Sequence, residues 1–255
     1  MNLEKSAIEK QIKNSVLLMP PLAETLERAQ FICKSHTLNG QLLYKLISID
    51  PILFCQTQIL FNYFYPKLTG TFNSISKIII LLNINTVKNH ILQFIVKTKA
   101  EQQKQLFLHS IAVGIASRFI AKERNIDRKK FELYYAAGLL HDIGKYFSCE
   151  LDHCITGEIA AKTIGLHKSL RNVVAYHHNI QEYNEHDSDL LFNVVLADYF
   201  VHKYIHTAGT EKYCVEIDDS IWKTLNLKKD FFASVDKDIR AEIKKIEKFI
   251  RAGIY

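Results

Sequence analysis

A His-Asp doublet, His141-Asp142, is the stretch of this sequence with the clearest capacity for chemistry. It ends an apolar segment and runs into Ile143, Gly144 and Lys145. Imidazole nitrogens and carboxylate oxygens bind divalent ions such as Mn²⁺, Fe²⁺, Zn²⁺, Ni²⁺ and Mg²⁺. Further residues of both types stand on either side of the doublet. The sequence therefore predicts a centre for one or two divalent metal ions, with the candidate ligands His109, His141, Asp142, His153, His177, His178 and Asp198.

Helical periodicity places these candidates on inward faces. His109 shares one face with Leu106, Val113, Ala116 and Ile120. Asp198 lies on an apolar face of the segment 188–207, and His177 continues that of the segment 168–178. Gly138, one turn before His141, is small enough to let another helix come close. Ligands from several helices are thus predicted to converge.

Two interpretations of this cluster stay open at the level of sequence. A buried carboxylate such as Asp198 needs a partner, and a divalent cation would provide one. The alternative is a polar core cluster, in which the histidines bond to the backbone. The sequence does not separate His177 from His178 as the ligand, because adjacent helical residues differ by about 100° in direction and helix ends fray. The periodicity of the apolar face gives His177 a mild advantage. The remaining histidines are predicted to be structural or surface residues: His36, His90, His167, His186, His202 and His206.

The elements that must position these side chains are predicted to be helices. The chain has 255 residues, 48% of them hydrophobic, with nine Gly and four Pro, too few for a protein rich in tight turns. Sustained two-residue alternation is missing, and helical periodicity dominates. We expect an all-α protein with helices near residues 3–16, 22–34, 39–48, 51–63, 74–82, 84–97, 102–123, 128–143, 153–165, 168–178, 188–207, 218–225 and 234–252.

A polar break at residues 98–103 divides the chain. It lacks Pro and Gly, so the parts on either side are expected to pack against each other. We predict two packed helical lobes, residues 1–100 and 101–210, followed by a C-terminal helical extension, residues 211–255. Asp127 is a candidate N-cap for the helix that leads to the doublet, and Gly144 is a candidate for its C-terminal stop.

The N-terminal segment, the longest apolar run and the cysteines indicate where in the cell the protein is located. The charged start MNLEKSAIEK lacks the apolar segment of a secretory signal, and the run Ile78–Leu82 is too short to cross a bilayer, which predicts a cytoplasmic protein without a membrane partner. Five cysteines without a CxxC pair predict reduced thiols. Cys149 and Cys154 flank His153 and suggest a zinc site, but the sequence has no second cysteine pair to complete it.

Much of the net charge of +6 lies between Lys228 and Arg251. Acidic residues are interleaved there at helical spacing, which favours a solvated helix face over a nucleic-acid patch. Nucleic acid is therefore not an expected partner.

At this point the residues resemble a known superfamily. The order His109, then His141-Asp142, then Asp198 is similar to the H…HD…D motif of the HD superfamily of metal-dependent phosphohydrolases. The first half resembles, within it, the HDOD domain (HD-related output domain) of bacterial signalling proteins. The resemblance covers about residues 15–210 and rests on Leu18–Thr25, Ile47–Pro51, Asn62, Ile75-Ser76 and Leu81-Leu82. One departure is Asn83, where the family usually has Gly, and this should alter a helix stop only.

The resemblance implies an HD-like bundle in the second lobe and two candidate functions. HDOD domains are regarded as signalling or scaffold modules, which implies a regulatory protein with an unidentified signalling partner. The alternative is a metal-dependent phosphohydrolase, a phosphodiesterase or an enzyme acting on nucleotides, whose catalytic residues would be Asp142 and Lys145. In the HDxGK pattern, Lys145 would face the phosphate of a phosphorylated small-molecule ligand.

Similarity to HD-GYP enzymes extends to the ligands but not to the substrate motif. His153 and the His177-His178 pair match additional ligands of that group. However, Asn179 stands in place of an acid, no Gly-Tyr-Pro follows, and Gln105 stands where some members have a bridging Glu. The regulatory function is therefore preferred.

Overall fold

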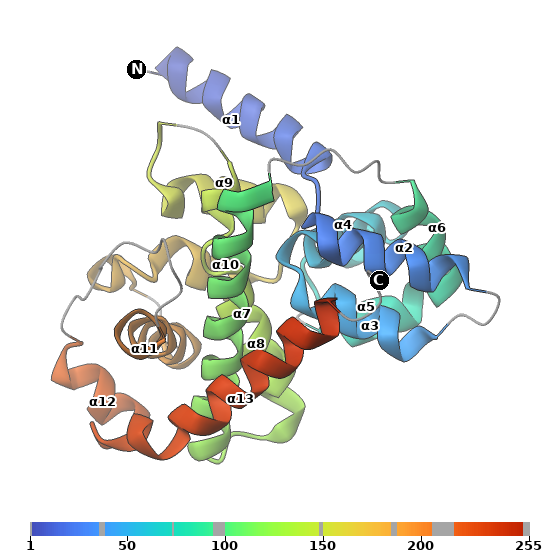
Figure 1. Ribbon diagram of the computed structural model, residues 1–255. Coiled ribbons are helices and arrows are strands. Elements are labelled where there is room, and N and C mark those ends of the chain that lie inside the picture. Colours follow the sequence, from blue (N-terminus) through green and yellow to red (C-terminus); the bar gives the residue numbers. More distant parts are fainter. Residues whose placement is uncertain are drawn as a thin grey trace.

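The computed structural model describes residues 2–35, 39–72, 74–93, 100–147, 150–184, 188–205 and 217–251. These residues form thirteen α-helices and four short 3₁₀ helices, without a strand, which confirms the all-α prediction (Figure 1). No helix among them is both long and apolar enough to cross a membrane.

The helices before residue 100 form a group that packs mainly within itself. Their bounds are α1 Asn2–Leu18, α2 Ala23–Lys34, α3 Gly40–Ile49, α4 Pro51–Phe64, α5 Ile75–Leu82 and α6 Ile84–Leu92, with the 3₁₀ helix η1 at Pro66–Leu68. Helix α1 differs from the others because it reaches over and packs on α9 of the following group. The predicted break at residues 98–103 falls partly outside the described residues, and α7 begins at Ala100.

The second group surrounds the long helix α7. Its bounds are α7 Ala100–Glu123, η2 Arg128–Lys130, α8 Phe131–Leu140, η3 Ile143–Tyr146, α9 His153–Ile164, α10 Lys168–Tyr176, η4 Ile180–Glu182 and α11 Asp189–Tyr204. Helix α7 packs most closely on α8 and α11. A Cβ atom on Gly138 would come within 2.7 Å of the Val113 carbonyl oxygen, so this glycine permits the close α7–α8 approach predicted for it.

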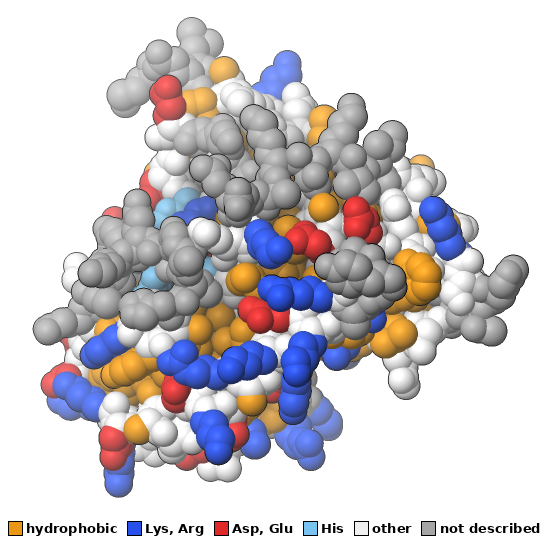
Figure 2. Space-filling model, viewed as in Figure 1, with side chains coloured by type: hydrophobic (Ala, Val, Ile, Leu, Met, Phe, Trp, Pro, Cys, Tyr) orange, Lys and Arg blue, Asp and Glu red, His pale blue; other side chains and the backbone are white. Residues whose placement is uncertain are grey.

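Two further helices close the fold. Helix α12 (Asp219–Leu225) packs on α11, and α13 (Phe231–Arg251) lies across α7 and reaches α2 (Figure 1). The buried face of α13 is aliphatic and aromatic, from Phe231 to Ile250. Lys and Arg side chains gather on the face of the molecule over which α13 runs, with acidic side chains between them (Figure 2).

Residues of the HDOD-like pattern connect the helices. The Asp50 carboxylate caps α4 by accepting bonds from the Ile52 and Leu53 amides, and it also accepts from the Leu22 amide and the Thr25 hydroxyl. Asn62 donates to the Ile164 carbonyl at 2.6 Å, which ties α4 to the end of α9.

Asn83 occupies a left-handed conformation, with φ of 66°, between α5 and α6. That conformation accounts for the glycine usual in the family at this point, because glycine adopts positive φ without steric cost.

The helix predicted over residues 128–143 is divided in the structure. The side chain of Asp127 caps η2 through the Lys129 amide, α8 ends at Leu140, and η3 follows. The prediction that Gly144 stops the helix was wrong, because Gly144 lies inside η3. Its missing side chain instead leaves room for α9, since a Cβ atom there would overlap the His153 carbonyl oxygen.

Candidate metal centre

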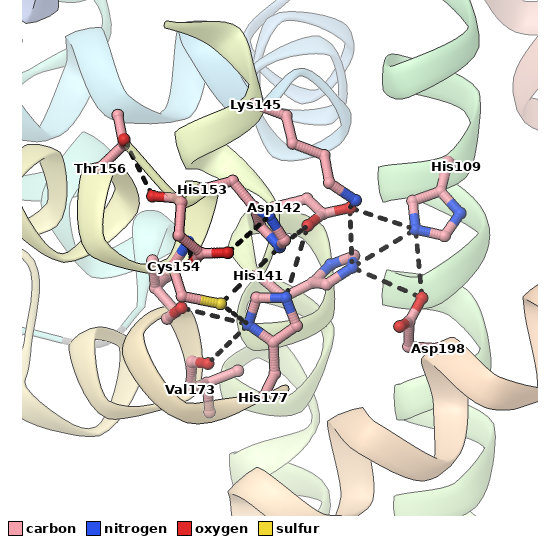
Figure 3. A network of polar contacts seen from close by, with 12 residues as sticks. His109, His141, Asp142, Lys145, His153, Cys154, Thr156, Val173, His177 and Asp198 are labelled. Atoms are coloured by element: carbon pink, nitrogen blue, oxygen red, sulfur yellow. Dashed lines mark hydrogen bonds and ion pairs between the residues drawn. The ribbon is translucent and has the colours of Figure 1, made fainter. Parts of the chain in front are cut away.

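Six helical elements bring the seven predicted ligands into one cluster, in which His153 is half-buried, His178 is exposed and the other five are buried. Figure 3 labels all of them except His178. His109 comes from the middle of α7, and Asp198 from the facing helix α11. His141 and Asp142 occupy the turn between α8 and η3. His153 is the first residue of α9, and the His177-His178 pair follows α10.

The first group of ligand atoms has dimensions that suit one metal ion. His109 Nε2 lies 3.4 Å from His141 Nε2 and 3.2 Å from Asp198 Oδ1, and the latter two atoms are 3.6 Å apart. Asp142 Oδ2 lies 3.5 Å from His109 Nε2 and 3.3 Å from His141 Nε2. Three ligand atoms separated by 3.2–3.6 Å, such as those of His109, His141 and Asp198, can all lie about 2.1 Å from one ion, which matches metal–nitrogen and metal–oxygen bond lengths.

A second group of ligand atoms lies on the other side of Asp142. The Nε2 atoms of His153 and His177 are each 3.4 Å from Asp142 Oδ1. His178 contributes a nitrogen to the same group, and all its potential ligand atoms lie within 4.8 Å of one another. The Asp142 carboxylate therefore faces both groups, Oδ2 toward the first and Oδ1 toward the second.

Several atoms of this cluster are buried without a hydrogen-bond partner. They are Oδ1 of Asp142, Oδ1 of Asp198 and Nε2 of His177. Buried polar atoms are otherwise almost always bonded, because leaving one unpaired costs about 1–3 kcal/mol. Their nearest neighbours are other ligand atoms of the cluster, at ion-pair distances. This arrangement fits divalent ions better than it fits a self-sufficient polar core.

Backbone carbonyls fix the orientation of two histidines. His141 Nδ1 lies 2.7 Å from the Gly138 carbonyl oxygen, and His177 Nδ1 lies 3.1 Å from that of Val174. A carbonyl accepts only, so Nδ1 must carry the proton and donate it. When the ring is neutral, its lone pair then resides on Nε2 and points into the cluster, as expected for a histidine that binds a metal.

Electrostatics couple the two buried carboxylates to the histidines. Burial raises the carboxylate pKa values, but neighbouring histidines outweigh burial and hold the pKa values of Asp142 and Asp198 well below their usual range. Burial likewise opposes a charge on His141, yet Asp142 raises the pKa of this imidazole to about 10. In the metal-free chain, protons on His109 and His141, whose pKa values are raised, thus balance the carboxylates. A divalent ion would replace those protons.

A cysteine, Cys154, lies beside the second group of ligand atoms. Cys154 Sγ lies 3.8 Å from His177 Nδ1, and Asp152, His153 and Cys154 form a third local group of potential ligands. Burial raises the pKa of the Cys154 thiol to about 12, so it is a neutral thiol near pH 7. Cys149, the other cysteine near His153, lies outside the described residues. The first and second groups themselves contain only imidazole and carboxylate donors.

Comparison with known proteins identifies the family. The HDOD domain model matches residues 19–179, more than half of the chain. The chain belongs to the HDOD domain family. No curated protein matches it.

The fold is similar to that of solved structures with few identical residues. The MmoQ response regulator of Methylococcus capsulatus aligns with a TM-score of 0.65 and 14% identity, over 85% of this chain and 97% of that one. A virulence factor of Campylobacter jejuni aligns with a TM-score of 0.58 and 15% identity, over 75% and 80%. An HDOD domain protein of unknown function from Geobacter sulfurreducens aligns with a TM-score of 0.50 and 16% identity, over 93% and 96%.

One residue of this HDOD centre was not foreseen from the sequence. His202 was predicted to be structural or exposed, but its Nε2 lies 3.3 Å from Asp198 Oδ1, and its ring centroid lies 4.8 Å from that of His109. Its position one turn after Asp198 on α11 was the available signal, because residues four apart share a helix face. His202 therefore extends the first group on the α11 side.

A cavity of about 430 Å³ opens onto the centre of the HDOD chain at Asp198 and the His177-His178 pair. Its described lining is partly apolar, with Ile180, Val195, Tyr199, Ile217 and Ile221, and partly acidic, with Glu182 and Asp218. None of its described lining residues is a Lys or Arg. The cavity thus offers a path to the metal ligands but little positive charge of its own.

Proposed function

We propose that this chain is a cytoplasmic regulatory HDOD protein whose buried centre binds one or two divalent metal ions. The observation that carries the proposal is the Asp142 carboxylate, whose two oxygens face two separate groups of imidazole nitrogens. His109, His141, Asp142 and Asp198 would hold one ion, and Asp142, His153, His177 and His178 the other. Mn²⁺, Fe²⁺, Zn²⁺, Ni²⁺ and Mg²⁺ are the candidates for such ligands.

A metal bound there would hold four helices in a fixed arrangement. The first group joins α7 to α11 through the turn after α8, and the second joins the same turn to α9 and the end of α10. Binding free energy of an ion that requires the folded site adds to the stability of the fold. The centre would in this way set the shape of a surface that a signalling protein partner recognises.

Two features favour regulation over hydrolysis. Lys145, the cation that a phosphate would need, is already 2.7 Å from Asp142 Oδ2. The cavity that leads to the centre is lined by acidic rather than basic described residues, which disfavours a phosphorylated ligand. Positive charge for such a ligand would come from the metals and from a displaced Lys145.

Phosphohydrolase activity is the second candidate, because the set of ligands and the cavity that reaches them support it. A bound divalent ion would supply Lewis-acid chemistry at a phosphoryl oxygen. In this function the Asp142 carboxylate would orient the reacting groups, and Lys145 would leave Asp142 to neutralise the phosphate. The 37% exposure of the Lys145 side chain gives it room for that movement.

Metal content and turnover together test the proposal. We expect at least one divalent ion per chain by inductively coupled plasma mass spectrometry after purification without chelator. We also expect no turnover of bis(p-nitrophenyl) phosphate or of a panel of cyclic dinucleotides with added Mn²⁺. Metal well below one per chain would contradict the metal centre. Metal-dependent turnover that Asp142→Ala abolishes, with the fold intact by circular dichroism, would establish the hydrolase instead.

A further inference from the structure

A second cavity, of about 550 Å³, lies where the two helical groups and α13 meet. Its walls come from α3, α4 and α5 on one side and from α7, α8 and α13 on the other. It shares no lining residue with the cavity at the metal centre. Its volume is in the range of small-molecule sites, and sites at such junctions are common in proteins.

Most of the lining of this junction cavity is apolar. The side chains come from five helices and include two aromatic rings: Ile49, Phe54, Ile75, Phe131 and Ile246. A hydrocarbon or aromatic body placed among them would be removed from water, which contributes about 25 cal/mol per Å² of apolar area. The larger part of an occupant is therefore apolar.

A buried hydroxyl in the junction cavity is left without a partner. Tyr135 is only 9% exposed, and its hydroxyl has no hydrogen-bond partner. Burial raises the pKa of this phenol, so the hydroxyl keeps its proton and can donate it. The guanidinium of Arg118 lies 5.6 Å from the centre of the Tyr135 ring. An unsatisfied donor in the wall of a cavity can bond an acceptor on an occupant.

The charges around the junction cavity favour an anion as that acceptor. Both of its carboxylates have partners: Glu242 pairs with Arg118, and Glu132 accepts bonds from Ser74 and Ser76. Two further cations, Lys45 and Lys245, line the cavity. Among the described residues neither forms an ion pair, and Lys45 instead lies 4.1 Å from the centre of the Phe249 ring. The net charge left over is positive.

The geometry points to the junction cavity as a binding site for a small amphipathic anion. The apolar body would lie against the five apolar side chains, and the anionic head would accept a bond from Tyr135 and face Lys45 and Lys245. Tyr135 and Ala136 belong to α8, the helix that ends at His141 and Asp142. An occupant would thus touch the helix that carries the metal doublet, which gives this regulatory protein a site for a chemical input.

Octanoate is the probe that tests this site, because it joins an eight-carbon body to one carboxylate and stays monomeric at low millimolar concentration. We expect saturable binding to the full chain in a ligand-detected NMR titration, with octylammonium, the cation of the same length, binding at least tenfold more weakly. Tyr135→Phe removes only the hydroxyl and should weaken octanoate about three- to tenfold, the effect of one hydrogen bond.

Charge variants provide the second measurement, on a protein whose fold is checked by circular dichroism. The double variant Lys45→Gln, Lys245→Gln should weaken octanoate about tenfold and reduce the discrimination against octylammonium. The matched control is Lys129→Gln, an exposed lysine outside the cavity, which should change neither affinity. Three outcomes would contradict the proposed site: octanoate binding that does not saturate, octanoate binding no tighter than octylammonium binding, or an octanoate affinity unchanged by the Tyr135 and lysine variants.

Discussion

Lys145 Nζ lies 2.7 Å from Asp142 Oδ2, the oxygen that faces the first group of ligands. Burial of the ammonium lowers the pKa of Lys145, but Asp142 outweighs this effect and raises it, so the lysine is charged at neutral pH. The Lys145 ammonium and a divalent metal ion would therefore compete for the same oxygen, Asp142 Oδ2. The 3₁₀ helix η3 places Lys145 three residues after Asp142, which makes this competition a local property of the motif.

Lys145→Met should strengthen metal binding. The substitution keeps the length and apolar stem of the side chain but removes a positive charge close to the proposed ion. We expect about tenfold tighter Mn²⁺ or Zn²⁺ binding by isothermal titration calorimetry, since like charges near a partly buried site repel by a few kcal/mol and the native ammonium relieves part of this by withdrawing into solvent. Lys162→Met, on the exposed side of α9, is the matched control and should leave the affinity unchanged. Weaker binding in Lys145→Met would contradict the competition.

The division of the centre into two groups predicts different metal stoichiometries for isosteric variants. Asp198→Asn should lose only the ion of the first group, and His177→Gln only that of the second. Asp142→Asn should lose both, because its carboxylate serves each group. Metal per chain can be measured by plasma mass spectrometry on proteins of verified fold. If Asp198→Asn and His177→Gln each removed all of the metal, the chain would hold one shared ion rather than two.

The sequence was sufficient to place His109 and Asp198 on buried helix faces, because each position was read from one helix at a time. His109 and Asp198 lie on the inward faces that a period of 3.6 residues predicts, and both are buried. The doublet was harder, because helix ends depend on capping and tertiary contacts. His141 and Asp142 lie in a turn after α8 rather than inside a helix that runs to residue 143.

Relationships between distant helices could not be read from the sequence. His202 belongs to the centre because it contacts Asp198 and His109. The sequence could not assign it there, because the contact with His109 depends on the packing of α7 beside α11. The contact of Glu132 with Ser74 and Ser76 joins residues more than fifty positions apart. Periodicity fixes which face of a helix is buried, but it does not specify the helix that covers that face.

Glu132→Gln should weaken the connection between the two helical groups. In the native chain the Glu132 carboxylate accepts from the Ser76 amide at 2.8 Å and from the hydroxyls of Ser74 and Ser76 at 2.7 Å each, at the start of α5. A neutral amide accepts more weakly, and the loss should be about 1 kcal/mol in the free energy of unfolding by urea. Glu158→Gln, whose partner Lys162 is on its own helix, should change stability by less than about 0.5 kcal/mol. Equal effects of the two substitutions on the free energy of unfolding would show that the Glu132 contact does not stabilise the packing of the two helical groups.

The ion pair of Asp189 and Arg124 predicts a pH-dependent difference in stability. Burial raises the pKa of Asp189, but bonds from Arg124 and Tyr134 lower it below 3.8. A carboxylate with a depressed pKa stabilises the fold fully above its ordinary pKa and loses that contribution as the pH falls through the folded-state pKa.

We expect Asp189→Asn to cost about 1–2 kcal/mol at pH 7, a range reduced because Asp189 is partly exposed. The difference from the native chain should shrink as the pH falls below 3.8, in denaturation curves recorded with chelator present. A difference that stayed constant down to pH 2.5 would mean that the carboxylate charge is not its source.

Gly144→Ala should damage the metal centre through the backbone alone. A Cβ atom at this position would overlap the His153 carbonyl oxygen and come within 2.7 Å of the Gly157 amide nitrogen, and neither backbone atom can rotate away. Helix α9, which begins at His153, would have to shift, at a cost of about 2–3 kcal/mol. The second group, which depends on His153, should bind its ion more weakly, while the first group is less affected.

The matched control for this substitution is Gly40→Ala at the start of α3. A Cβ atom there would meet only Ile84 Cγ1 at 3.7 Å, an ordinary contact, and alanine restricts the unfolded chain more than glycine does. Its free energy of unfolding should stay the same or rise by up to about 0.5 kcal/mol. Thermal unfolding with and without Zn²⁺ distinguishes the two variants, because Gly144→Ala should also lose part of the stabilisation by the metal. Full retention of that stabilisation in Gly144→Ala would show that the η3–α9 contact does not position His153.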